Sequence, residues 1–510
     1  MSSPLRSGGR QKRASTRADT RADTSMAKGT EIARPFGPLS ARQIEDIHNA
    51  ALQVLENIGM ARATPRVIDV ALANGCHCDD AGRLRFPRQV VETCLSVAAR
   101  AFVVHGRDPA RDFDARNGVV NFATGGAAVK MLDRQSRRYR PSTLNDLYDL
   151  ARVADDLPNI QWFARPVVAT DVADDFDLDV NTIYACAAGT SKHIATSFAS
   201  GDNLRRIAPM LDLLAGGCFR ARPFCTVHAT TVVSPLNFAE ESLDVACAAV
   251  DIGMPIQVQT GPQAGATAPA ALAGTLVQTC AEGLASLCVI NMLSPGHSVV
   301  LGNWAFTSDL RTGAFSGGSG EAALLGAASG QMSAFYGVPG GMGAGMSDSK
   351  LPDNQAGYEK ALTLTLAALS GGGFVYESAG MLASLLGCSI EALIIDDEML
   401  SSVRRVARGI EVTPDSLSVD VIRDAVQGEG HFLGMAQTLR LMETEFTYPK
   451  HADRASPDDW ENSGSTDIWD RARAHAETML SLDKPMKIDA ETDRQIRKAY
   501  TIHLPRKGGT

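Results

Sequence analysis

Short apolar runs alternate with longer helical patterns along most of the chain. The apolar runs cover residues 162–169, 193–198, 224–229, 255–259, 298–303, 337–345, 373–378 and 430–433. Helical spacing of apolar positions covers residues 144–155, 203–215, 237–252, 270–292, 321–335, 356–369 and 390–408. Strands that alternate with helices form parallel sheets, and eight strands are the number that closes a (β/α)8 barrel. We therefore predict an α/β protein built on a (β/α)8 TIM barrel over residues 143–445.

An open, doubly wound sheet is the alternative arrangement of the same elements. Such a sheet normally carries G-x-G-x-x-G directly after its first strand, and the chain has no such motif in that context.

The segments on either side of the predicted barrel have different patterns. Residues 1–37 are basic and rich in Arg, Ser and Thr, which predicts a disordered tail. Residues 38–142 begin with helical spacing after a capping Ser40 and continue as extended segments with turns. They predict an N-terminal α/β extension that packs on the barrel. Residues 446–510 are polar and helical, which predicts a C-terminal helical tail on the outside.

Composition narrows the class of protein. The chain has 510 residues with 45% hydrophobic content, enough for a large core, and its net charge of −9 argues against a nucleic-acid partner. Ten cysteines without a C-x-x-C pair indicate reduced thiols in the cytoplasm rather than a metal site. The apolar stretch 270–293 contains Gln278, Glu282 and Asn291, so we interpret it as a core helix and expect no membrane span. We expect a cytoplasmic homo-oligomer.

In a barrel, the functional residues lie where strands end and loops begin. This rule selects the positions after each predicted strand, namely Thr170, Asp171, Ser200, His228, Thr230, Thr231, Gln259, Thr260, Asn303, Trp304, the loop 345–350, Tyr376, Glu377 and His431.

Residues 312–360 combine many glycines with reactive side chains. Glycine lets the backbone approach a ligand closely, although a run of tight turns would have the same composition. Lys350 in this segment could form a Schiff base or orient an anion, or it could be a solvated loop lysine. Asp348 could balance a cation or be solvated. Glu321 begins a helix, where the helix dipole alone would favour it.

Glu377 and several aromatic residues suggest a cation site. Glu377 follows the apolar run Gly373-Phe-Val-Tyr, and a carboxylate facing a barrel mouth is explained by a cationic ligand. Aromatic faces bind quaternary ammonium groups, although core packing would explain each aromatic residue taken singly. The aromatic candidates are Trp304, Tyr336, Tyr376 and Phe432. His228 and His431 are too dispersed to indicate a metal site.

A set of motifs gives the chain a family resemblance. They are Ser191-Lys-His-Ile, Gly265-Ala-Thr-Ala-Pro-Ala, Ala273-Gly-Thr, Ala281-Glu-Gly-Leu-Ala, Ser294-Pro-Gly, Asp309-Leu-Arg-Thr-Gly, Tyr336-Gly-Val-Pro, Gln355-Ala-Gly-Tyr-Glu and Trp460…Gly464. Together they resemble the trimethylamine methyltransferase family over most of residues 38–500.

The resemblance implies a (β/α)8 barrel that moves a methyl group from a methylated amine to a corrinoid. The corrinoid is held by a separate partner protein, and this chain lacks the Asp-x-His-x-x-Gly signature of proteins that carry cobalamin themselves. Archaeal members carry pyrrolysine before the Gln-Ala-Gly-Tyr-Glu motif, where this chain has Lys350 as the nearest equivalent. The resemblance therefore favours the non-pyrrolysine branch, whose members demethylate quaternary amines such as glycine betaine.

The leaving group supports a quaternary substrate independently. A quaternary ammonium leaves as a neutral amine, so the protein needs only to hold the cation in line with cobalt and exclude water. Under this hypothesis Trp304, Tyr336, Tyr376 or Phe432 holds the ammonium. Glu377 or Asp348 balances its charge, and Lys350, His228 or His431 orients a substrate carboxylate.

Four alternatives remain open from the sequence. The chain could use trimethylamine itself, or transfer the methyl group to another acceptor such as a folate. It could also be a betaine-binding protein without activity, or a barrel lyase that uses Lys350 as a Schiff-base amine.

Overall fold

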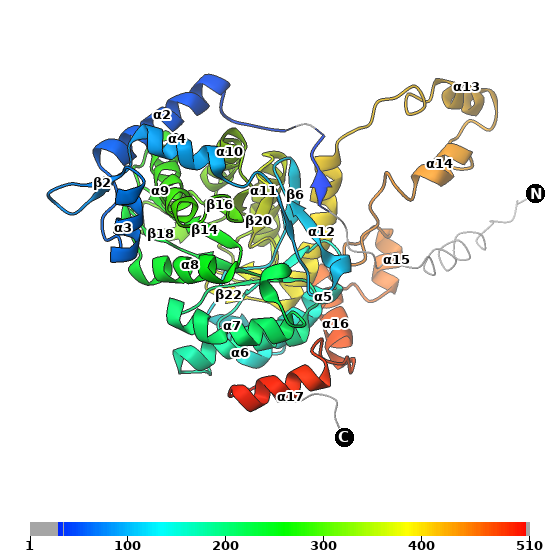
Figure 1. The fold of residues 1–510 in the computed structure, drawn as a ribbon. Helices are drawn as coiled ribbons and strands as arrows, with labels where there is room; N and C mark the ends of the chain where they lie inside the picture. The colour runs from blue at the N-terminus through cyan, green and yellow to red at the C-terminus, as the bar shows by residue number, and fades with distance from the viewer. Residues whose placement is uncertain (1–28, 34, 506–510) are drawn as a thin grey trace, which may run out of the picture.

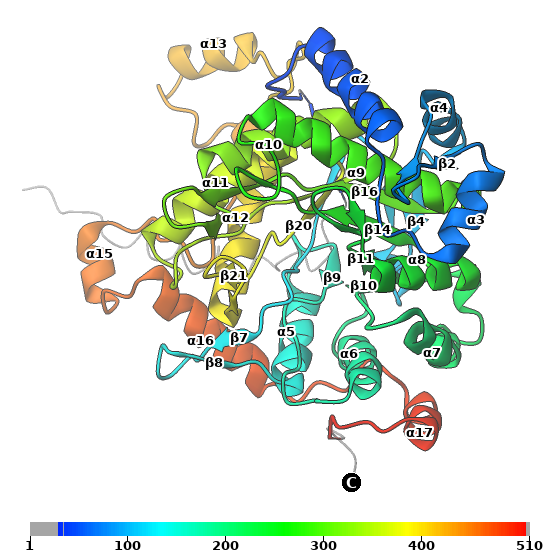
Figure 2. The same ribbon diagram turned by 90° about the vertical axis from the view of Figure 1, so that its left-hand side faces the viewer.

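The computed structural model describes residues 29–33 and 35–505. Eight parallel strands form the centre, and helices surround them (Figure 1 and Figure 2). In spatial order the strands are β6 (Val119–Phe122), β20 (Phe374–Tyr376), β19 (Gly340–Gly343), β16 (Val299–Asn303), β14 (Ile256–Thr260), β11 (Cys225–Ala229), β10 (His193–Thr196) and β9 (Trp162–Ala164). A parallel bridge between Ala123 and Trp162 joins β6 to β9. This bridge closes the ring, and the predicted (β/α)8 barrel is confirmed.

The strand predicted at residues 430–433 is wrong. These residues form no strand, and Phe432 and Leu433 are exposed. The eighth strand is instead β6, which lies before residue 143 and pairs in parallel with β20. Apolar residues in a short run do not reveal which other strand they will pair with, so the sequence pattern alone could not choose between the two segments.

Helices on the outside connect the strands. They are α5 (Leu144–Asp156), α6 (Asp175–Gly189), α7 (Gly201–Leu214), α8 (Glu240–Ile252), α9 (Leu272–Leu293), α10 (Gly320–Tyr336), α11 (Asn354–Leu369) and α12 (Ile390–Arg408). The pattern did not predict α6, because residues 179–189 of this helix are buried on every side and leave no polar face. Part of that cover comes from α17 (Ala490–Ala499), where Asp493 accepts a hydrogen bond from Tyr184 of α6.

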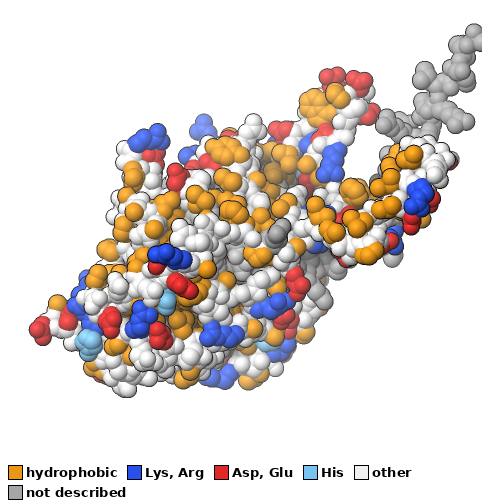
Figure 3. Space-filling view, turned by 90° about the horizontal axis from the view of Figure 1, so that it is seen from above, with side chains coloured by type: hydrophobic (Ala, Val, Ile, Leu, Met, Phe, Trp, Pro, Cys, Tyr) orange, Lys and Arg blue, Asp and Glu red, His pale blue; other side chains and the backbone are white. Residues whose placement is uncertain are grey.

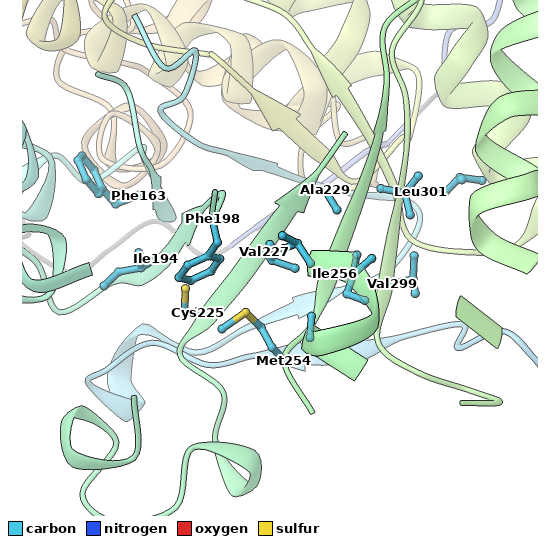
Figure 4. Close-up of a cluster of buried hydrophobic side chains, with 14 of the residues drawn as sticks. Phe163, Ile194, Phe198, Cys225, Val227, Ala229, Met254, Ile256, Val299 and Leu301 are labelled. Atoms are coloured by element: carbon cyan, nitrogen blue, oxygen red, sulfur yellow. The ribbon is translucent and has the colours of Figure 1, made fainter. Parts of the chain in front are cut away.

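Strand side chains that point away from the barrel axis form the main core. Phe163, Ile194, Val227, Ile256 and Leu301 lie between the strands and the helices (Figure 4). Their neighbours along each strand point inward instead, because side chains alternate between the two faces of a strand. The inward positions therefore carry the polar and aromatic residues of the interior.

Residues before β6 cover one side and one end of the barrel. Helices α2 (Ala41–Asn57), α3 (Pro65–Ala73) and α4 (Arg88–Val97) pack on α9. In the described chain α9 is the one helix long and apolar enough to cross a membrane, and it is mostly buried by these neighbours. Ser40 and Gln43 form a capping box at the start of α2. Most of the predicted disordered tail lies outside the described residues, but β1 (Thr30–Glu31) pairs with β6.

A hairpin closes the end of the barrel where the strands begin. It consists of β4 (Phe102–Val104) and β5 (Phe113–Ala115). Phe113 from this hairpin contacts Phe374 of β20, with ring centroids 6.0 Å apart. Val104, Phe113 and Ala115 belong to the same buried cluster as the interior side chains of the barrel. The interior is therefore sealed at this end.

Loops after the strands surround the opposite end. One four-stranded sheet there contains β7 (Lys130–Leu132), β8 (Tyr139–Pro141), β21 (Met381–Leu382) and β22 (Gly387–Cys388). Further small sheets pair β12 (Val232–Val233) with β13 (Asn237–Phe238), and β15 (Gln263–Ala264) with β17 (Phe306–Asp309) and β18 (Ala314–Ser316). Together they form a collar around the open mouth.

The chain after α12 first leaves the body and then returns to it. Helices α13 (Val419–Gln427) and α14 (Ala436–Leu441) project from the molecule (Figure 1). After α15 (Pro457–Asn462), helix α16 (Ile468–Ser481) packs on α12 and α5.

Candidate active site

A cavity of about 180 Å³ lies at the carboxyl ends of the barrel strands. This is the end of a TIM barrel at which catalytic groups are found. The cavity is lined by Gly125, Gly126, Ala127, Arg165, Thr196, Ser197, His228, Thr230, Gln259, Trp304, Tyr376 and Glu377. These residues come from the ends of seven of the eight barrel strands or from the turns that follow them.

Aromatic rings cluster at this cavity, where Tyr376 and Trp304 belong to the lining. The ring centroid of Tyr376 lies 4.5 Å from that of Trp162, 5.2 Å from that of His228 and 5.3 Å from that of Trp304. The Tyr376 hydroxyl and the indole nitrogens of both tryptophans are buried without a hydrogen-bond partner among the described residues. Buried polar groups are normally paired, so the Tyr376 hydroxyl and the Trp304 indole nitrogen, which belong to cavity-lining residues, are available to a ligand or to water.

Glu377 is the acidic residue of the cavity. It follows β20 with a positive φ of 62°, a conformation that costs about 1–3 kcal/mol for a residue other than glycine and that clusters at functional sites. The side chain is buried, and its Oε2 has no partner in the described protein. Burial raises the pKa of Glu377 from 4.5 to about 8. An unpaired carboxyl group in this position is suited to a cationic ligand.

Arg165 supplies the opposite charge. It follows β9, and its Nη2 donates a hydrogen bond to Ser197 Oγ at 2.9 Å. Burial lowers the pKa of Arg165 from its ordinary value. No salt bridge joins this guanidinium to a carboxylate among residues 29–33 and 35–505. The cavity therefore contains one partly buried cation and one buried carboxyl group, and among the described residues neither forms a salt bridge.

Two histidines inside the barrel differ in their contacts. His193 is held by the carbonyl of His105 and the hydroxyl of Thr226, both at 2.7 Å, which is a structural arrangement. His228 lines the cavity, and its Nε2 has no partner among the described residues. Burial, and then the positive charge of Arg165, lower the pKa of His228 to about 3. His228 is therefore a neutral imidazole that can donate or accept a hydrogen bond.

The structure brings four of the predicted site residues together. Glu377, Trp304, Tyr376 and His228 all line the cavity, as do Thr230 and Gln259 from the strand-end positions. These residues were selected because they follow strands that the sequence pattern had placed correctly.

The glycine-rich loop lies beside the cavity without lining it. Asp348 accepts hydrogen bonds from Ser316, Gly317 and Ser384, and so holds three loops of the collar together. Lys350 is exposed, and its Nζ donates to the carbonyl of Asp348 at 2.7 Å. Asp348 therefore fixes the loops around the mouth relative to one another, and the Lys350 side chain lies in solvent.

The other predicted site residues do not line the cavity. Glu321 is exposed at the first turn of α10, and Tyr336 is buried at the last turn of that helix. His431 and Phe432 are exposed between α13 and α14. Their placement at a barrel mouth was wrong because it depended on the strand predicted at residues 430–433.

The sequence pattern did not identify Arg165 or the turn at 124–126 as part of the site. Arg165 interrupts the apolar run 162–169, and a charged residue within a buried strand region was the available signal. The turn Thr124-Gly-Gly was seen as a turn, but β6 was assigned to the N-terminal extension. Gly125 has φ of 147°, and a Cβ added there would lie 3.3 Å from Glu377 Cγ, so this glycine makes room for Glu377.

Comparisons with known proteins identify the family of the chain. Residues 6–508 match the family model described as trimethylamine methyltransferase (MTTB). The chain is 32% identical over 456 residues to trimethylamine methyltransferase MttB of Methanosarcina thermophila, covering 88% of this chain and 94% of that protein. It is 29% identical over 461 residues to a glycine betaine methyltransferase of Desulfitobacterium hafniense strain Y51, covering 90% of this chain and 95% of that protein.

Among solved structures, a dihydropteroate synthase from Coxiella burnetii in complex with pteroic acid gives a TM-score of 0.38 at 13% identity, covering 60% of this chain and 99% of that chain. The family assignment depends on the sequence matches, which extend over nearly the whole chain. The chain belongs to the trimethylamine methyltransferase family and is a methyltransferase.

Proposed function

We propose that this methyltransferase takes a methyl group from a betaine, a quaternary ammonium compound that also carries a carboxylate, and delivers it to the corrinoid of a partner protein. The observation that carries the proposal is that Glu377 and Arg165 line one cavity of about 180 Å³ and that, among the described residues, neither is in a salt bridge. The ammonium group of a zwitterion can pair with Glu377, and its carboxylate can pair with Arg165.

The ammonium end would lie against Trp304 and Tyr376. Aromatic faces attract quaternary ammonium groups, and the attraction is larger in a desolvated site, about 2 kcal/mol or more. Glu377 balances the remaining charge. Its pKa of about 8 means that it carries a proton at neutral pH without ligand, and a bound cation favours its charged form.

The carboxylate end would bind the guanidinium of Arg165. Arginine offers a planar pair of donors that matches a carboxylate, and burial strengthens this pairing. His228 and Ser197 lie on the same cavity and can complete the hydrogen bonds of the carboxylate. Arg165, and not the exposed Lys350, would therefore orient the carboxylate of the substrate.

Methyl transfer then needs no general base. The corrinoid supplies a Co(I) nucleophile, to which the methyl carbon bonds as its C–N bond breaks and the amine leaves neutral. The residues of this chain hold the methyl group at the open mouth and keep water away from it. Trimethylamine, the substrate named for several relatives, has no anionic group to pair with Arg165, and this chain contains no pyrrolysine.

An anaerobic assay tests the proposal. The purified chain is mixed with reduced cobalamin, and the Co(I) absorbance is followed as the methyl-Co(III) species forms. Glycine betaine, carnitine and proline betaine are compared with trimethylamine and with choline, which has the ammonium but no carboxylate. Turnover with a betaine and little with choline supports the proposal. Turnover with trimethylamine alone contradicts it, and binding of betaine without methyl transfer to cobalamin or to a reconstituted corrinoid protein would indicate another acceptor.

A further inference from the structure

The segment 409–448, which we call the arm, leaves the body after α12 and returns to it before α15 (Figure 1). Arg405 fixes both of its ends. The guanidinium donates to the carbonyl of Gly409 at 2.7 Å, to the carbonyl of Glu445 at 2.8 Å and to the carboxylate of Glu445 at 2.7 Å. The arm is therefore a defined projection with a single base rather than a loose loop.

The arm has no core of its own. Ala425 is the one buried residue of the arm, all of which is described. Polar groups join α14 to the turn before α13, such as Arg440 to Asp415 at 2.9 Å. Ordering a backbone costs about 1–2 kcal/mol per residue, and buried apolar area normally offsets that cost. The arm lacks this stabilisation within the single chain.

Apolar side chains of the arm face solvent instead. On α13, Val419, Ile422 and Val426 share one face and are 62%, 49% and 73% exposed. The full set of large exposed apolar residues is Ile410, Val412, Leu417, Val419, Ile422, Val426, Phe432, Leu433, Leu439, Phe446 and Tyr448. Figure 3 shows hydrophobic side chains along this projection at the upper right. The exposed areas of these side chains sum to on the order of 1,000 Å².

A second apolar surface lies on the body, over α10 and α11. We call it the α10–α11 face, and it consists of Phe36, Leu324, Phe335, Tyr358 and Leu362, which are 40% to 63% exposed. The outer side of α11 carries no charged group. Its two charged residues, Glu359 and Lys360, are buried. Outer helices of a soluble barrel normally present a polar face, so this surface is suited to a protein contact.

We infer that the occupant of both surfaces is a second copy of this chain, with the arm of each copy lying on the α10–α11 face of the other. Both surfaces are present on one chain, so a twofold arrangement covers each of them twice in a closed dimer. Two arms contribute an area on the order of 2,000 Å², which is at the upper end of the standard size for a stable interface.

The position of the arm argues against the corrinoid protein as its partner. The base of the arm follows Ala407, whose carbonyl accepts a hydrogen bond from Ala33, and neighbouring Ile32 donates to Gly118 immediately before β6. The arm therefore begins at the end of the barrel where the strands start. The cavity lies at the opposite end. A partner that exchanges a methyl group with the cavity would dock at the mouth and leave the arm uncovered.

Light scattering coupled to size-exclusion chromatography tests the dimer with the full chain. We expect twice the mass of one chain at micromolar concentration, and the mass of one chain for the double variant Ile422→Asp, Val426→Asp and for Leu362→Asp. The matched control is Leu310→Asp, because Leu310 is 65% exposed but lies outside both surfaces. A monomeric wild-type chain overturns the inference, as does a dimer that survives both sets of changes.

Cross-linking keeps the test valid if an arm variant fails to fold. The exposed cysteines Cys78 and Cys218 are first replaced by serine. Chains carrying only Val426→Cys are then mixed with chains carrying only Leu362→Cys, and a bis-maleimide reagent is added. We expect a cross-linked pair that contains one chain of each kind. Absence of this pair, or an equal yield when Leu310→Cys replaces Leu362→Cys, overturns the arrangement.

Discussion

Gly125 and Glu377 approach each other so closely that a Cβ on residue 125 would lie 3.3 Å from Glu377 Cγ. The two residues follow β6 and β20, which are far apart in the sequence and adjacent in the barrel. The side chain that is absent at position 125 therefore helps to fix where the carboxyl group of Glu377 lies.

Gly125→Ala should reduce kcat/KM for the betaine by about tenfold or more, because displacement of a catalytic-site group by a fraction of an ångström has large kinetic effects. Steady-state kinetics measures this loss. The control is Gly82→Ala, which also has positive φ, at 75°, but has nothing within 4 Å of the added Cβ. Both variants should lose stability by about 1 kcal/mol, and only the first should lose activity. Equal kinetic losses would contradict this role of Gly125.

Glu377 should make the protein less stable as pH rises. Its pKa is raised from 4.5 to about 8 in the folded chain, so between these values the folded state keeps a proton that the unfolded state has lost. Stability therefore falls as pH rises from 4.5 to 8. Glu377→Gln removes this contribution, and thermal melts across the range should show a smaller decline than in the wild type. A variant with the wild-type pH dependence would show that Glu377 ionises normally.

The same pKa predicts how ligand binding depends on pH. A quaternary ammonium ligand prefers the carboxylate form of Glu377, so its Kd should fall about tenfold for each pH unit up to about 8 and then level off. Isothermal titration calorimetry in two buffers of different ionisation enthalpy would also detect the released proton. In Glu377→Gln the pH dependence should disappear, and affinity should be weaker by about 10-fold or more at the upper end of the range.

Arg165→Met should distinguish the two ends of the substrate. Glycine betaine should bind about 100-fold more weakly, since the variant loses a buried charge-assisted pair, whereas choline should change little. The ratio of the two Kd values is the measurement, because a general disturbance of the cavity would weaken both ligands. Arg165→Lys keeps the charge but not the paired donors and should fall between the two. Loss of both ligands in parallel would refute the carboxylate role.

Lys350→Ala should change methyl transfer by less than about twofold, because the exposed Lys350 side chain contacts only its own loop. Its backbone carbonyl, which accepts a hydrogen bond from Tyr139, is kept in the variant. Borohydride treatment with a carbonyl compound should trap no adduct at this position. A trapped adduct, or a large loss of activity, would restore the lyase alternative.

The sequence predicted most of the barrel because its strands and helices follow one another in a regular pattern. It missed the closing contact between Ala123 and Trp162, because pairing between separate segments leaves no local signal. It missed α6 for a related reason, since burial by α17 removed the polar face that reveals a surface helix. Elements covered by remote parts of the chain cannot be recognised from local periodicity.

Which site residues could be predicted depended on which strands local periodicity revealed. Tyr376 and Glu377 were selected because β20 was placed correctly and the rule for strand ends is general. Arg165 directly follows β9, and the partner strand β6 was assigned to the N-terminal extension, so the relation of Arg165 to Glu377 could not be seen. Phe432 was selected by the same rule but lies on the arm. It was placed at the barrel mouth only because a strand was wrongly predicted at residues 430–433.

Phe113 and Phe374, which seal the far end of the barrel, have a kinetic consequence for the proposed reaction. A chamber with one entrance cannot receive its amine from behind once the methyl acceptor covers the front. The amine must therefore enter first, and the demethylated amine must wait until the acceptor departs. Initial-rate measurements should accordingly follow a compulsory-order pattern, with the demethylated amine as the last product released.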